Sequence, residues 1–230
     1  MSATTVAGVM LVTLPIAFNA AFAALTARFD YPDILRRPTR EVLTRFREGG
    51  TGLVLLWWVF AMTAALLAPV AVLLAGALRD ADGDLRAVGA TMGVLAAVVQ
   101  LLGLVRWPLL VPYLARVADE PDASPARLEA VDIVFQAFNR YLGVAVGEHL
   151  GYLFTGAWTV LVGVALAQTT AAPGWLGFAG VVIGGLLALC SLEFVGGFER
   201  TGWKVAGALT PIAYIAWSVW LLATGVALLV

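Results

Sequence analysis

The sequence contains very little cysteine, histidine or charge. Among 230 residues there is one cysteine and one histidine, and charged residues make up 13% of the chain. A lone cysteine excludes a disulfide within the chain. Cys190 and His149 by themselves also lack the ligand number that a zinc or haem site needs. We therefore expect no metal and no cofactor in this protein.

Sequence signatures of several enzyme classes are missing as well. The chain has no phosphate-binding glycine loop, no HExxH, no GxSxG and no CxxC, so ATP hydrolysis, zinc proteolysis and serine-esterase chemistry have no support. Its fourteen basic residues, all arginine except Lys204, form no patch typical of nucleic-acid binding. We expect no nucleic-acid partner.

Apolar residues are what the sequence has in excess. They make up 61% of the chain, whose mean hydropathy is +0.93, whereas a soluble domain carries about 45–50% apolar residues. Such a chain cannot cover its apolar surface when it is surrounded by water. Its first partner is therefore the lipid bilayer.

Six apolar runs are long enough to cross a membrane, because a helix of roughly 20 residues spans about 30 Å of hydrocarbon. The sequence thus predicts an all-α fold, in which residues 1–230 form one membrane domain built as a bundle of six transmembrane helices. No positively charged leader precedes the first run, so we expect that helix to be retained. The runs cover about 5–27, 52–78, 87–113, 143–167, 175–196 and 205–229.

The basic residues are distributed unequally between the connections. Ten lie in the first, third and fifth connections, two in the second and none in the fourth. Cytoplasmic loops carry the excess of Lys and Arg, so we expect both termini outside and the Arg-rich connection 28–50 in the cytoplasm. The ten are Arg28, Arg36, Arg37, Arg40, Arg45, Arg47, Arg116, Arg127, Arg200 and Lys204, and the two are Arg79 and Arg86.

Residues 39–48 in the first connection have a helical pattern. Thr39 is a candidate N-cap, and Val42, Leu43 and Phe46 form an apolar edge among charged residues. This pattern suits a helix lying on the membrane surface. An ordinary charged loop is the alternative interpretation.

Residues 124–142 form a second unusual connection. Pro125 after Ser124 is a typical helix start, and apolar residues recur at helical spacing behind it. We expect an amphipathic cytoplasmic segment that runs into the fourth transmembrane helix, with a bend near Gly143.

Glycines recur every four residues in the fourth helix. Gly143, Gly147 and Gly151 form a ridge of small residues, and Gly180 and Gly184 repeat the spacing in the fifth helix. Such ridges allow the close approach of a neighbouring helix. They predict helix packing, and the first of them also suggests a homo-oligomer contact.

The fourth helix also carries polar residues. If each residue turns by 100°, Tyr141, Glu148 and Tyr152 share one face, with His149 beside them. Glu148 then lies roughly 12 Å inside the membrane from Arg140. An ionised carboxylate at that depth needs a partner, water or a proton. Glu148 and His149 are therefore candidate acid–base groups.

Other helices contribute polar candidates in the same half of the bundle. Asn19 lies in the first, Arg106 in the third and Glu193 near the end of the fifth. We expect Glu148 and Glu193 to share the charges of Arg106 and Arg140. The candidate binding residues are Asn19, Arg106, Arg140, Tyr141, Glu148, His149, Tyr152 and Glu193.

Two interpretations of these residues compete. They are either interhelical hydrogen bonds and ion pairs that fix the packing, or the lining of a functional pocket. The leading hypothesis is a protein that binds a small hydrophobic or lipid-like ligand around Glu148. The alternatives are an enzyme with acid–base chemistry on an isoprenoid or lipid, of the cyclase or isomerase type, a small-solute or proton-coupled transporter, and an accessory subunit of a membrane complex.

Seven of the eight tryptophans lie at or near predicted helix ends, where an interfacial aromatic belt is expected. Trp158 lies deeper and is a candidate to line a cavity. The seven are Trp57, Trp58, Trp107, Trp175, Trp203, Trp217 and Trp220.

Three stretches resemble a known group of proteins. FNAAFAALTARFDYPDILRRPT, VGEHLGYLFTGAWTVL and LTPIAYIAWSVWLL are similar to bacterial six-helix membrane proteins grouped as domains of unknown function. The resemblance implies the same topology and a location in the cytoplasmic (inner) membrane of a bacterium. It implies no activity and no catalytic residue.

Overall fold

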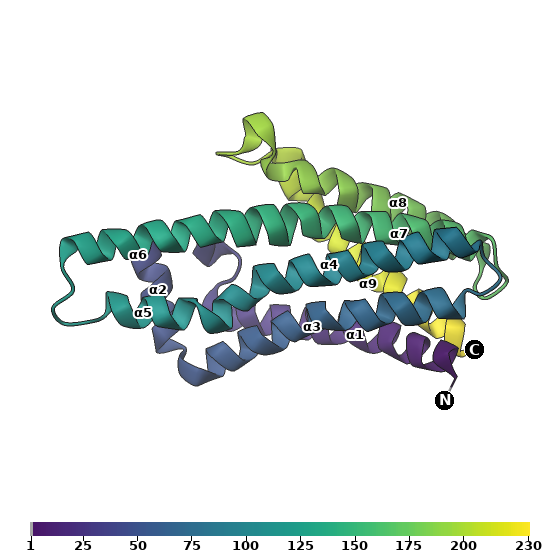
Figure 1. Cartoon of the computed structure of the whole chain (residues 1–230), viewed down its shortest axis with the longest axis horizontal. Coiled ribbons are helices and arrows are strands. Elements are labelled where there is room, and N and C mark those ends of the chain that lie inside the picture. The colour runs from purple at the N-terminus through teal and green to yellow at the C-terminus, as the bar shows by residue number, and fades with distance from the viewer. Residues whose placement is uncertain (1) are drawn as a thin grey trace.

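Six long helical spans run along the longest axis of the molecule (Figure 1). A computed structural model describes residues 2–230, and in that part of the chain the regular structure is entirely helical. Each span is long and apolar enough to cross a bilayer, which confirms the predicted six-helix membrane fold. The spans are Ala3–Phe29, Gly50–Ala77, Gly83–Ala118, Pro125–Ala167, Gly174–Phe194 and Lys204–Leu229.

Several spans are made of more than one element. The first, second and sixth are the helices α1 (Ala3–Phe29), α3 (Gly50–Ala77) and α9 (Lys204–Leu229). The third joins α4 (Gly83–Leu109) to α5 (Val111–Ala118), and the fourth joins α6 (Pro125–Phe138), the π-helix η2 (Asn139–Leu150) and α7 (Gly151–Ala167). The fifth is α8 (Gly174–Cys190) with the 3-10 turn η3 (Ser191–Phe194). Three short elements lie in the connections, namely η1 (Asp33–Arg36), α2 (Thr39–Glu48) and η4 (Gly196–Phe198).

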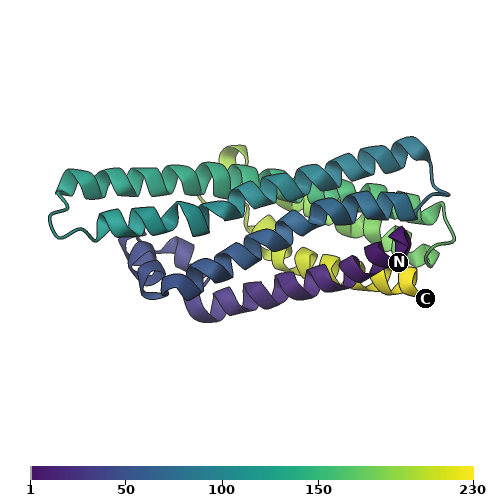
Figure 2. The same cartoon turned by 60° about the horizontal axis from the view of Figure 1, so that its bottom comes forward.

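Both chain ends lie at one end of the bundle, and α2, α5 and α6 lie at the other (Figures 1 and 2). This arrangement follows from an even number of spans. Eight of the ten basic residues, those of the first and third connections, therefore gather at the end opposite the termini, while the fifth connection with Arg200 and Lys204 lies nearer the middle of the long axis (Figure 1). The bundle thus has one Arg-rich end and one end with few basic residues.

The third span is longer than the predicted run of 87–113, and the fourth joins the predicted segment 124–142 to the predicted run of 143–167. Residues 125–167 would measure roughly 65 Å as an ideal helix, about twice the hydrocarbon thickness. Ser124 begins this helix, since its hydroxyl accepts a hydrogen bond from the Arg127 N–H at 3.3 Å. The predicted helical segment before residue 143 is thus confirmed. Near Gly143, where a bend is expected, the helix changes from the α to the π type, and the bend itself stays a prediction.

The helix α2 packs on protein. Val42, Leu43 and Phe46 are each at most 3% exposed, because α5 and α6 cover the apolar edge of α2. The predicted helix over residues 39–48 is thus confirmed and the alternative of a loop is wrong, while the apolar edge of this helix packs on protein. The N-cap interpretation of Thr39 is also wrong, since its hydroxyl donates to Asp132 and accepts from Gln136 Nε2 at 2.9 Å.

An aromatic cluster forms the core at the Arg-rich end. Trp57 of α3 and Trp107 of α4 are fully buried and stack with ring centroids 4.4 Å apart and an angle of 9°. Phe29, Phe46 and Phe135 surround Trp107 at 5.5–6.3 Å between centroids. This core joins α1, α2 and α6 to α3 and α4, because one phenylalanine ring from each of the three contacts Trp107.

The expected interfacial belt is therefore wrong for most of its members. Besides Trp57 and Trp107, the side chains of Trp217 and Trp220 are also buried. Their indole N–H groups donate to Thr159 Oγ1 at 2.9 Å and to the Leu176 carbonyl at 2.8 Å. The two tryptophans that are clearly exposed are Trp58 (49%) and Trp175 (62%).

Glycines bring α7 and α8 into close contact. A Cβ on Gly156 would lie 2.6 Å from the Gly184 carbonyl oxygen, and a Cβ on Gly163 would lie 2.6 Å from that of Gly177. Neighbouring backbones in a membrane can approach this closely only at glycine. The packing role predicted for Gly184 and its neighbour Gly180 is thereby confirmed within the chain.

Candidate functional site

An open groove of about 540 Å³ lies between η2 and the end of α8. One wall comes from the end of α6, η2 and the first turn of α7, and the other from the last residue of α8, η3 and the residues that follow. The end of α8 diverges here from the long fourth span, as Figure 1 shows. Six of the eight candidate residues line this groove, namely Arg140, Tyr141, Glu148, His149, Tyr152 and Glu193.

The other two candidates lie elsewhere and connect helices. Asn19 Nδ2 donates to the Pro15 carbonyl at 2.7 Å and to Ser218 Oγ at 3.0 Å, which ties α1 to α9. The buried Arg106 guanidinium donates to the Gly103 carbonyl and, at 3.0 Å, to Asn139 Oδ1. Both side chains thus have partners that fix the bundle.

The expected sharing of charge is not what the structure contains. Arg140 pairs with Glu199, and both side chains are more than half exposed. In the described part of the chain, no ion pair includes Glu148 or Glu193. Two carboxyl groups therefore border the groove without a basic partner.

The fourth span is a π-helix where it borders the groove, and Tyr141, Glu148 and Tyr152, which were expected to share one face, all line that groove. Over residues 139–150 each N–H pairs five residues back, so the angle per residue is smaller than the 100° assumed from an α-helix. Tyr141 points outward and is 68% exposed, whereas Glu148 is only partly exposed. Such π-helical stretches are rare and occur frequently at functional sites.

The glycine ridge of the fourth span seats η2 on α4. Ideal Cβ atoms on Gly143 and Gly147 would lie 2.6 Å from Arg106 Nη2 and 3.1 Å from the Gly103 Cα, and one on Gly151 would meet Gln100 at 3.0 Å. The glycine ridge thus packs against α4 of the same chain. Association of two copies stays a prediction and would need another surface.

His149 connects the two walls of the groove. Its Nδ1 lies 2.8 Å from the Ser191 carbonyl oxygen. Because a carbonyl only accepts, Nδ1 carries the proton, and a neutral ring then has its lone pair on Nε2. The histidine therefore holds η2 against the end of α8.

Sequence reasoning missed two further phenols near Glu148. Tyr214 of α9 contacts Tyr152 with ring centroids 5.2 Å apart, and Tyr31 follows α1 and packs edge-on against Trp57 at 4.9 Å. Burial raises the pKa of Tyr31 to about 12. The nearby Glu148 carboxylate adds to this rise, and the positive charge of Arg106 opposes it. Its hydroxyl therefore stays protonated near neutral pH.

The groove lies at the end of a span that is just long enough to cross the hydrocarbon. The span formed by α8 and η3 has 21 residues, about 31 Å of helix, and ends beside His149. This length would place the groove near headgroup level, and the depth of Glu148 stays a prediction. Apolar side chains are exposed near the opening, namely Tyr141, Leu189, Leu192 and Val195.

A family model described as "Domain of unknown function (DUF4386)" matches residues 6–225. The chain belongs to this family. The match covers nearly the whole chain and confirms the resemblance to membrane proteins grouped as domains of unknown function. Searches of curated proteins and of solved structures found no match. The DUF4386 description carries no activity, so a function has to be argued from the residues.

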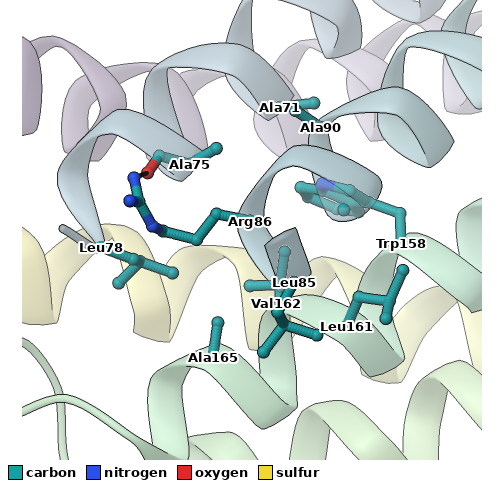
Figure 3. Close-up of a pocket in the computed structure, with 11 residues that line it drawn as sticks. Ala71, Ala75, Leu78, Leu85, Arg86, Ala90, Trp158, Leu161, Val162 and Ala165 are labelled. Atoms are coloured by element: carbon teal, nitrogen blue, oxygen red, sulfur yellow. Dashed lines mark hydrogen bonds between the residues drawn. The ribbon is translucent and has the colours of Figure 1, made fainter. Parts of the chain in front are cut away.

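A second hollow in this DUF4386 chain lies between α3, α4 and α7 near the opposite end (Figure 3). Trp158 borders it, as predicted, but its volume of about 10 Å³ leaves room for at most about one water molecule. Figure 3 shows the Arg86 guanidinium beside the Ala75 carbonyl, to which it donates at 3.1 Å. Arg86 thus donates a hydrogen bond to a backbone carbonyl in the last turn of α3. The hollow has no space for a ligand.

Proposed function

We propose that this DUF4386 protein binds an amphiphile, with its polar head in the groove between η2 and the end of α8. The observation that supports this most directly is that Glu148 borders a groove of about 540 Å³ and has no basic partner. A carboxyl group on a membrane-spanning segment is a functional-site hypothesis by default. An amphiphile at this level would place its head among polar groups and its chain in the bilayer.

The lining fits such a ligand. Ala145, Val144 and Phe194 offer apolar contacts next to the polar groups, and exposed Leu192 and Val195 lie on the lipid-facing surface near the opening. Ligand sites typically combine mostly apolar walls with a few placed polar groups. The volume accommodates a headgroup and the first part of one chain.

The proposal is tested by mass spectrometry of what co-purifies with the protein. We expect wild-type protein, purified in a mild detergent, to retain an amphiphile that Glu148→Gln retains at several-fold lower occupancy, because the substitution removes the unpaired charge while conserving shape. Glu129→Gln is the matched control, since Glu129 is exposed on α6 and does not line the groove. The proposal would be contradicted if wild-type and Glu148→Gln protein were both folded and neither retained an amphiphile.

A second candidate function is acid–base chemistry on a lipid or isoprenoid. It is favoured by the phenols of Tyr31, Tyr152 and Tyr214 around one carboxyl group, because such groups can donate protons and stabilise a developing cation. Conversion of a fed lipid by wild-type membranes and not by those with Glu148→Gln would favour the enzyme. Transport and membership of a larger complex stay predictions.

We also propose that the Arg-rich end faces the cytoplasm of a bacterium, with both termini outside, because most of the basic residues gather there. In a Cys190→Ala background, Thr170→Cys and Asp122→Cys place thiols in exposed loops at opposite ends. A membrane-impermeant maleimide should label Thr170→Cys in intact cells and Asp122→Cys only after permeabilisation. The reverse pattern would overturn the orientation.

A further inference from the structure

The charges around the groove favour a cation at its inner part. Among the groups that line it, Glu148 and Glu193 have no ion pair in the described chain, whereas Arg140 is already paired with Glu199. Arg200 is exposed at the rim. The lining therefore carries three carboxyl groups and two guanidinium groups. The unpaired Glu148 and Glu193 are more buried than Arg200, the guanidinium group without an ion pair in the described chain.

In the described chain neither carboxyl group forms an ion pair, although the charge of the buried Arg106 acts on Glu148 from the α4 side of η2. Arg106 lies on the α4 side of η2, against Gly143, and its donors are directed to the Gly103 carbonyl and to Asn139. His149 directs its Nδ1–H to the Ser191 carbonyl. The two carboxyl groups are therefore left without a direct hydrogen-bonded base, and a cationic ligand in the groove would supply one.

Aromatic rings beside the carboxyl groups suit the same kind of ligand. Tyr152 lines the groove next to Glu148 and contacts the ring of Tyr214, and Phe194 lines it next to Glu193. Ring faces attract ammonium groups, and this attraction adds to that of a carboxylate. An anionic or uncharged head would gain neither contribution.

We propose that the amphiphile bound in the groove carries an ammonium head, held by Glu148 and Glu193, an inference that rests on the proposed function. The apolar chain leaves past Val144 and Val195 toward the bilayer. The juxtaposition that carries the proposal is that of two unpaired carboxyl groups and two aromatic rings in a groove at the end of the fifth span.

Three probes with the same chain test the head alone, namely dodecylamine, dodecanol and dodecanoate. Their dissociation constants are measured by native mass spectrometry on the full chain in maltoside detergent at pH 7. We expect wild-type protein to bind dodecylamine at least about tenfold more tightly than the other two, because charge-assisted contacts are the stronger ones. Glu148→Gln and Glu193→Gln should each weaken dodecylamine binding about tenfold and leave dodecanol binding unchanged.

The outcomes separate the inference from the proposed function. The inference of an ammonium head would be overturned if the protein preferred dodecanoate and Arg200→Gln removed that preference. Equal binding of all three probes would overturn it too. In both cases the proposed binding of an amphiphile would stand. Binding of dodecylamine that neither glutamate substitution weakens would also overturn the ammonium head. If folded wild-type protein binds none of the probes and retains no amphiphile, the proposed function fails as well. Glu129→Gln again serves as the control and should bind as the wild type does.

Discussion

Replacing Trp57 by alanine is expected to lower the free energy of unfolding by about 3–5 kcal/mol, the usual cost of removing a large buried aromatic side chain. The ring is fully buried, stacks on Trp107 and touches Phe29, Tyr31 and Phe60 at its edges. Its removal leaves a cavity where α1, α3 and α4 meet. The midpoint of thermal unfolding in detergent, followed by size-exclusion chromatography, measures the loss.

The next residue along the chain is the matched control. Trp58 is 49% exposed and faces away from this cluster, so Trp58→Ala should cost less than about 1 kcal/mol. Trp57→Phe separates packing from polarity, because the Trp57 indole N–H is buried without a hydrogen-bond partner. Phenylalanine keeps much of the stacking and removes that unsatisfied donor, so it should cost far less than alanine. Equal losses for Trp57→Ala and Trp58→Ala would contradict the importance of the cluster.

The sequence was sufficient to predict the number and type of spans, because membrane insertion demands long apolar runs that are visible locally. It was insufficient at the Arg-rich end. The rule that tryptophan gathers at membrane interfaces placed Trp57 and Trp107 in a belt, but α2, α5 and α6 build a layer of protein that buries both. Such a layer arises from contacts between distant segments and leaves no local periodic signal.

The candidate site was predicted in part for a related reason. Glu148, His149 and Tyr152 are close in sequence, so their grouping was visible, whereas Tyr31 follows the first helix and Tyr214 lies in the last one. The predicted faces assumed an α-helix throughout. A π-helix changes the angle between residues and follows from tertiary packing, so the sequence pattern alone does not reveal it.

The packing that holds η2 in place can be tested at one glycine. A Cβ on Gly103 would lie 2.7 Å from the Gly147 Cα and 2.9 Å from the Leu142 carbonyl oxygen, both of them backbone atoms of η2. Backbone atoms cannot move aside as the end of a flexible side chain can. Gly103→Ala should therefore cost about 3 kcal/mol, at the upper end of the usual range for overpacking. Gly89→Ala in the same helix is the control, because its Cβ would meet Leu161 at an ordinary 3.6 Å.

The same substitution connects the packing to the proposed site. Because η2 carries Glu148 and His149, moving it away from α4 would alter the distance across the groove to Ser191 and Glu193. We expect folded Gly103→Ala protein to lose most of the retained amphiphile, whereas Gly89→Ala should retain it at the wild-type level. If a destabilised Gly103→Ala protein still retained the amphiphile, binding would not depend on how η2 packs against α4. This result would place the binding determinants on α8 and η3, the wall that α4 does not touch.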